Sequence, residues 1–126
     1  MALTKITSDG ITDGTVVNAD INASAAIDGS KITPTFSTDA TINGVTVGKG
    51  TGSTASNTVL GASALDSSSL SGSNATAIGD RALTALTSGT NNTAVGAIAG
   101  LGITTGISNT IIGSRSGIAL AAGSYN

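Results

Sequence analysis

The second half of the chain repeats one pattern of apolar and small polar positions. Four glycines anchor the repeats at intervals of 18, 17 and 17 residues: Gly61, Gly79, Gly96 and Gly113. One position before each anchor is an aliphatic residue (Leu60, Ile78, Val95, Ile112), and three positions before it is a threonine (Thr58, Thr76, Thr93, Thr110). The threonines suit strands, and their hydroxyls are expected to form a ladder from repeat to repeat. Repetition at a fixed period is typical of chains whose repeats stack on one another.

A second glycine column divides each repeat into two short apolar segments. Its members are Gly72, Gly89 and Gly106, continued by Gly123. Three positions before them are Leu86, Ile103 and Leu120, with Leu70 displaced by one. Asparagine stands four positions before three anchors, at Asn57, Asn92 and Asn109, with Asn74 displaced by one. Glycine permits corners and close backbone packing. The pattern therefore predicts a solenoid of short strands that turn at glycines, each turn presenting an aliphatic stripe to its neighbours.

The first part of the chain is interrupted by turn signals at short intervals. Asp-Gly pairs at 9–10, 13–14 and 28–29 mark turns, and single β-branched residues separate them. Short extended segments are expected, with a capped helix over 18–27 as an option. Residues 41–47 have the composition of a strand or hairpin. We therefore divide the chain into an N-terminal segment 1–40, a linker or lead-in strand 41–56 and a repeat region 57–126.

The N-terminal segment is expected to dock on a partner, since short segments between turns bury too little surface to fold alone. Its apolar side chains are the candidate docking residues: Ile6, Ile11, Val16, Val17, Ile21, Ile27, Ile32 and Phe36. For Phe36, packing at the junction between the two regions is the alternative.

Composition excludes most catalytic and ligand-binding classes. The 126 residues include no His, no Cys and no Glu, and five basic against seven acidic residues give a net charge of −2. Triads, thiol catalysis and Cys or His zinc sites cannot be built. We therefore expect no enzyme, no cofactor and no metal. Five scattered cations and two aromatic residues argue against a nucleic-acid platform, and no apolar run is long enough to span a membrane.

Three further motifs have plainer explanations than the functions they suggest. The run 48–52 has no Ser or Thr directly after Lys49, so it is expected to be a linker and not a phosphate loop. The aspartates between positions 9 and 28 lack calcium-loop spacing and fit solvated turns, with a cation at a trimer axis as the alternative. Arg81 and Arg115 share one repeat position, which suits a basic column for acidic glycans, whereas Asp80 beside Arg81 suits solubility or pairing between subunits.

Several segments resemble known phage proteins. The runs 57–65 (NTVLGASAL) and 92–96 (NTAVG) resemble the NTAxGxxAL units of bacteriophage tail-fibre and virion spike proteins. The AIG run at 77–79 is similar to head repeats of trimeric autotransporter adhesins, although those repeats are shorter. Residues 42–48 and 11–22 resemble lead-in and N-terminal segments of such fibres, including those of cyanobacterial phages. The resemblance implies a homotrimer on the virion that serves attachment or decoration, and it carries over no catalytic residue.

The last two repeats depart from this pattern. Gly100 and Gly117 stand where the first two repeats have Leu65 and Leu83, so a narrower or differently closed cross-section is expected. The pattern stops at Asn126, where another Asn-Thr unit would begin. We therefore expect either a fragment of a longer fibre or a tip that closes by trimerisation.

The sequence thus predicts an all-β fold, in which an extended N-terminal docking segment precedes a trimeric repeat β-solenoid or β-roll fibre shaft of 17–18-residue repeats. The predicted protein is a trimeric virion fibre or spike, held to a tail adaptor or capsid protein by its N-terminal segment and projecting the shaft for host attachment. A host surface glycan is a further candidate partner. The alternatives are a capsid decoration or cement protein, and a monomeric carbohydrate- or ice-binding solenoid. Neither nucleic-acid binding nor membrane insertion is expected.

Overall fold

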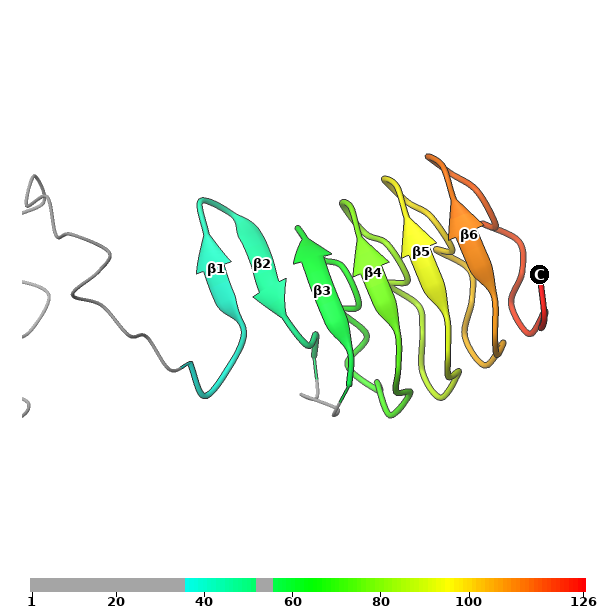
Figure 1. Ribbon diagram of the computed structural model, residues 1–126, viewed down its shortest axis with the longest axis horizontal. Coiled ribbons are helices and arrows are strands. Elements are labelled where there is room, and N and C mark those ends of the chain that lie inside the picture. The colour runs from blue at the N-terminus through cyan, green and yellow to red at the C-terminus, as the bar shows by residue number, and fades with distance from the viewer. Residues whose placement is uncertain (1–35, 52–55) are drawn as a thin grey trace, which may run out of the picture. The chain divides into compact units, whose positions relative to one another are not determined.

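The described part of the chain is all-β, as the sequence predicts. The computed structural model describes residues 36–51 and 56–126, which form one six-stranded sheet and contain no helix. The strands are β1 (Ala40–Ile42), β2 (Val45–Gly48), β3 (Thr58–Gly61), β4 (Thr76–Ile78), β5 (Thr93–Val95) and β6 (Thr110–Ile112). They lie side by side in chain order (Figure 1). Residues 1–35, with the optional helix over 18–27, lie outside the described residues.

A hairpin opens the sheet. β1 and β2 pair antiparallel, with Ile42 opposite Val45, so the connection has two residues. These are Asn43 and Gly44, at φ 49° and 81°, and an Asn-Gly pair with two positive φ angles is the preferred tight turn between twisted strands. β2 then pairs antiparallel with β3.

The repeats stack directly on one another from β3 to β6. Thr58 pairs in parallel with Thr76, Thr76 with Thr93, and Thr93 with Thr110, so every strand residue meets its counterpart one repeat later. The connections also bond from one repeat to the next, since the Leu65 amide donates to the Ala82 carbonyl across 2.9 Å. Strands and connections therefore both contribute backbone hydrogen bonds between repeats.

The second apolar segment of each repeat is a series of turns, and the expectation of a strand there is wrong. In the second repeat, Arg81 and Leu83 have φ angles of 53° and 52°. The equivalent positions of the other repeats are also positive: Ser63, Leu65, Ile98, Gly100, Arg115 and Gly117. Extended backbone requires negative φ, so positive values at alternate residues prevent a strand. Each repeat therefore supplies one strand.

The core lies between the sheet and these turns. One residue of each stacked strand points inward (Val59, Ala77, Ala94, Ile111), and the turns add Leu65, Leu83, Leu86 and Ile103; all are buried. Leu70, the displaced member of its column, is also buried. Alanine makes up much of this core, so the interior is narrow.

A ladder of buried asparagines runs beside the apolar core. Asn92 and Asn109 are fully buried, and the Asn109 amide nitrogen donates to Asn92 Oδ1 across 2.9 Å. Asn74 is not part of this ladder. Ala75 occupies the corresponding position in its repeat, and its backbone amide donates to Asn57 Oδ1. Asn74 lies at an exposed corner instead, with φ 56°. The displacement of Asn74 by one position in the sequence pattern thus reflects a different place in the repeat, which it shares with Asn91.

The substitution of leucine by glycine in the last two repeats does not leave the interior empty. Gly100 and Gly117 have φ angles of 62° and 63°, the same left-handed conformation as the leucines they replace. A Cβ on Gly117 would lie 2.8 Å from Cδ1 of Ile111, so the larger strand residue fills the space. At Gly100 the nearest side chain is that of Leu83 in the preceding repeat, followed by Ile111.

Candidate interaction surface

The predicted repeat anchors lie at the ends of the stacked strands, where backbones approach closely. Gly79 and Gly96 have φ angles of 124° and 135°, which side-chain-bearing residues rarely adopt. A Cβ on Gly96 would lie 2.6 Å from the carbonyl carbon of Gly113 in the next repeat. The Gly96 amide meanwhile donates to the Ile78 carbonyl across 2.8 Å. Glycine is therefore required at these positions for two reasons: the backbone conformation disfavours a side chain, and the next repeat leaves no room for one.

The outer face of the sheet carries a column of aliphatic side chains. The strand register places one on each of five successive strands, and we call them the aliphatic stripe: Val47, Leu60, Ile78, Val95 and Ile112. Ile112 is 70% exposed and Leu60 is 45% exposed. Ile42 and Val45, which pair with each other in the hairpin, are exposed beside the stripe.

A threonine column borders the stripe on β3 to β6. Thr58 and Thr110 are exposed, and Thr76 and Thr93 are half-buried. Each lies two residues before a member of the stripe, and side chains two apart on a strand share one face. No hydrogen bond joins neighbouring hydroxyls of this column in the described residues, so the expected hydroxyl ladder does not form. The strands of the outer face therefore carry no charge and present apolar and hydroxyl groups side by side.

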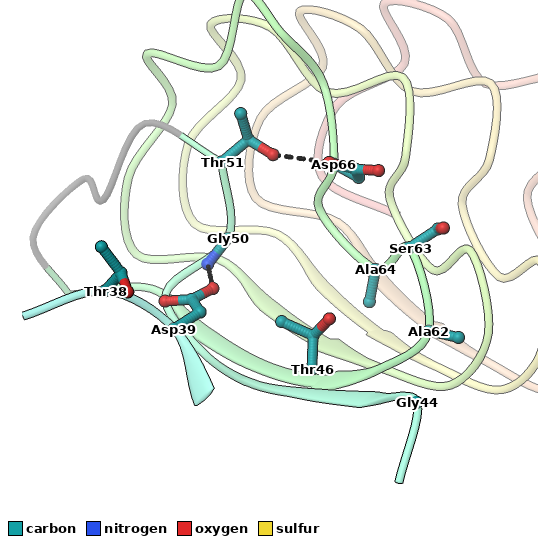
Figure 2. Close-up of a pocket in the computed structure, with 10 residues that line it drawn as sticks. All are labelled: Thr38, Asp39, Gly44, Thr46, Gly50, Thr51, Ala62, Ser63, Ala64 and Asp66. Carbon is teal, nitrogen blue, oxygen red and sulfur yellow. Dashed lines mark hydrogen bonds between the residues drawn. The ribbon is translucent and has the colours of Figure 1, made fainter. Parts of the chain in front are cut away.

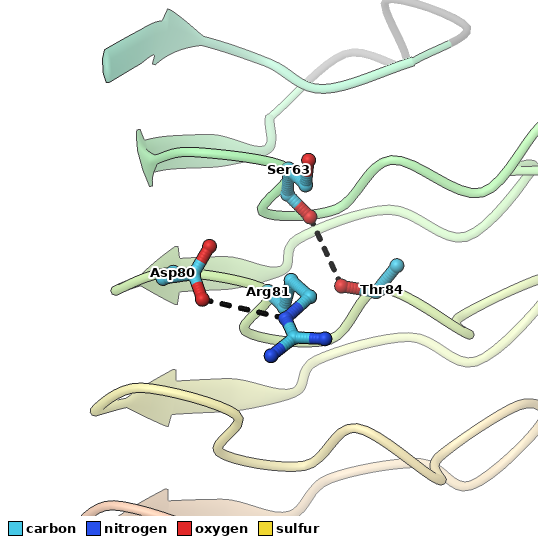
Figure 3. Close-up of polar contacts among 4 residues, drawn as sticks. All are labelled: Ser63, Asp80, Arg81 and Thr84. Carbon is cyan, nitrogen blue, oxygen red and sulfur yellow. Dashed lines mark hydrogen bonds and ion pairs between the residues drawn. The ribbon is translucent and has the colours of Figure 1, made fainter. Parts of the chain in front are cut away.

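The charged corner beside the anchors is discontinuous. Arg81 Nε lies 3.3 Å from Asp80 Oδ2, and both side chains are about half exposed (Figure 3). Arg81 and Arg115 share one repeat position, but Ile98 occupies that position in the repeat between them. At ~4.8 Å per strand spacing, the two arginine backbones are roughly 10 Å apart. The predicted basic column thus consists of two separated cations, one of them paired within the chain.

An open hollow of about 470 Å³ lies between the hairpin and the first repeat. Its carboxylates are already engaged: Asp39 accepts from the backbone amides of Lys49 and Gly50, and Asp66 Oδ1 accepts from Thr51 Oγ1 across 2.7 Å (Figure 2). The segment predicted as a linker is thus tied to the hairpin at Lys49 and Gly50. Within the described ranges, no group of three or more metal-ligating side chains is positioned to hold an ion.

Most of the predicted docking residues cannot be placed. Ile6, Ile11, Val16, Val17, Ile21, Ile27 and Ile32 lie outside the described residues. Phe36 is 65% exposed, and Tyr125, the other aromatic residue, is 77% exposed. The exposure of the aliphatic stripe was not predicted from the sequence. The threonine two positions before each member was a signal, because residues two apart on a strand share one face and threonine is usually exposed.

Comparison of the chain with protein-family models, with curated proteins and with solved structures finds no match. The class of the protein therefore follows from its fold alone: the described part of the chain is all-β and forms one sheet. None of the described segments is a helix of the length and apolar character needed to cross a bilayer.

Proposed function

We propose that this protein is a structural component of a virus particle: a trimeric fibre or spike held to the virion by residues 1–40, with residues 57–126 forming a β-solenoid shaft. The shaft projects from the particle and serves attachment to the host. The proposal extends the resemblance of its NTAxG-type repeats to phage fibre and spike proteins.

The stacking of the repeats is the observation that carries this proposal. Each repeat meets the next through parallel strand pairs, through bonds between connections such as Leu83 N to Ala99 O, and through the asparagine ladder. The strand residues pair with their counterparts 17 or 18 positions away, and the other bonds also join neighbouring repeats. Stacks of this kind grow in one direction and are stiffened by bonds along their length, as a supporting shaft requires.

A second candidate function is that of a capsid decoration or cement protein. In this alternative, residues 1–40 bind capsid subunits and the stack stands on the capsid surface.

The native mass of the full chain, measured at several concentrations by light scattering coupled to size-exclusion chromatography, tests the proposal. One chain has a mass of 11.9 kDa, so a trimer is expected near three times that value and is expected to persist on dilution. Far-UV circular dichroism on the same samples reports folding. A folded single chain contradicts the trimer and favours a monomeric carbohydrate- or ice-binding solenoid. An unfolded single chain also contradicts a self-sufficient trimer.

A further inference from the structure

Three of the four stacked strands place the larger side chain outside and the smaller one inside, and β6 has isoleucine on both faces. On β4 the inward residue is Ala77 and the outward one is Ile78; on β5 they are Ala94 and Val95. A sheet with water on its outer face has the opposite arrangement, since burial of large apolar side chains drives folding. The outer face therefore has the composition of a surface that is covered.

The chemistry of this face limits what can cover it. The charged residues of the described ranges are Asp39, Lys49, Asp66, Asp80, Arg81 and Arg115, and none of them lies on a strand. A charged partner would thus find no complementary group on the face and would lose hydration there. The partner surface must be apolar or hydroxyl-bearing, as this face itself is.

The spacing of the stripe narrows the partner further. Its members recur once per strand, at ~4.8 Å, from Val47 to Ile112. A partner that seats every member must repeat at the same spacing over the same length. A second copy of this sheet has that spacing, and parallel stacks keep it in register along their whole length.

The face is small for an interface between two copies alone. Six strands and about four residues per strand give a face of roughly 300 Å², the size of patches that mark interaction sites on single chains. A stable two-chain interface needs about 800 Å² per partner. In a closed ring each copy contacts two neighbours, so surface on both sides of the stripe, including the threonine column, is buried in addition to the stripe itself.

We propose that the copies of this chain meet through the outer face of the sheet, with the aliphatic stripe directed at a threefold axis parallel to the stacking direction. This inference rests on the proposed trimer and assigns the surface that forms it. Ile78 and Val95 then form apolar layers around the axis, one layer per repeat.

Cysteine cross-linking locates the interface. The chain has no cysteine, so Val95→Cys introduces a single thiol on the stripe, and Ser88→Cys introduces one at an exposed position in the connection between β4 and β5. Disulfides require Cβ atoms about 4 Å apart. Under mild oxidation with diamide, most Val95→Cys chains are expected as linked pairs on a non-reducing gel, since two of three thiols combine. Ser88→Cys is expected to give no pair above the level of random collision.

The native mass of the same samples distinguishes a trimer with a different interface from a chain that does not form a trimer. A trimer in which Ser88→Cys links and Val95→Cys does not would overturn this interface while leaving the trimeric proposal intact. A wild-type chain that is monomeric overturns the proposed trimer before any thiol is introduced. As a second measurement, Val95→Asp is expected to reduce the native mass from three chains to one with an unchanged circular dichroism spectrum, whereas Ser88→Asp remains trimeric. A Val95→Asp trimer as stable to dilution as the wild type counts against the interface even where cross-linking is ambiguous.

Discussion

Replacing Asn92 by alanine is expected to destabilise the protein through the asparagine ladder. The Asn92 amide nitrogen donates to the Gly106 carbonyl across 2.7 Å, and its Oδ1 accepts from the amide nitrogen and the backbone amide of Asn109 at 2.9 and 3.1 Å. Alanine fits at this rung, because Ala75 occupies the same place one repeat earlier. The substitution therefore removes three buried hydrogen bonds without introducing a clash.

The magnitude follows from those three bonds. A hydrogen bond contributes about 1 kcal/mol net, and a buried group left without its partner costs about 1–3 kcal/mol. The groups left behind are the Gly106 carbonyl and the two donors of Asn109, all buried. We expect Asn92→Ala to lower the free energy of unfolding by about 3 kcal/mol. With a urea dependence of about 2 kcal/mol per molar, the unfolding midpoint falls by roughly 1.5 M.

Urea unfolding followed by far-UV circular dichroism measures this change. All variants are compared at one chain concentration, because association contributes to apparent stability. The matched control is Asn74→Gly, which removes an exposed asparagine at φ 56°, a conformation that glycine adopts freely. It loses only the 3.2 Å bond from Asn74 to Asn91, so a change below about 0.5 kcal/mol is expected. A loss for Asn92→Ala no larger than that of the control would refute the ladder argument.

Four further substitutions test the close packing at the glycines, the asparagine ladder and the exposed ion pair. Gly96→Ala is expected to lower the free energy of unfolding by more than about 3 kcal/mol or to prevent folding, because its Cβ would lie 2.6 Å from backbone atoms at φ 135°. Gly44→Ala has no atom within 4 Å of its Cβ and is expected to lower it by only about 1–2 kcal/mol. Equal urea midpoints for the two variants would contradict the close-packing explanation. Ala75→Asn supplies the missing rung and is expected to raise the free energy of unfolding by about 1–2 kcal/mol; a lower midpoint would show that the rung has no room. Asp80→Asn breaks a half-exposed ion pair and is expected to change stability by less than about 0.5 kcal/mol at low and high salt.

The sequence predicts the fold class and the repeat period because both depend on local, recurring chemistry. Glycine at fixed intervals and β-branched residues before each anchor are sufficient to place β3 to β6, and Thr58, Thr76, Thr93 and Thr110 pair as counterparts in the sheet. The second segment of each repeat was mispredicted because leucine and alanine do not reveal a positive φ. Leu65 and Leu83 adopt that conformation only because burial in the core compensates for its cost.

The candidate surface was predictable only in part. Alternation along a strand indicates which residues share a face, so the sequence shows that Thr93 and Val95, two positions apart, lie on the same face. Alternation does not indicate which of the two faces is buried. Of Ala94 and Val95, the usual preference for burying the larger apolar residue selects Val95, whereas the structure buries Ala94. Only the closure of each repeat by its turns decides the direction.

The leucine-to-glycine change in the later repeats shows why such repeats must be compared across columns as well as along them. A left-handed residue other than glycine costs about 1–2 kcal/mol, and full burial of a leucine contributes about 1.5–3 kcal/mol, so either residue is tolerated at this position. The choice depends on the neighbouring strand. Beside Leu83 the inward strand residues are Ala77 and Ala94, which leave room, whereas Ile111 reaches to within 2.8 Å of the Cβ position at Gly117. In the last repeat the strand residue thus occupies the space that a leucine of the turn would take, whereas at Gly100 the nearest side chain is that of Leu83 in the preceding repeat. The loss of leucine alone therefore does not predict a narrower stack.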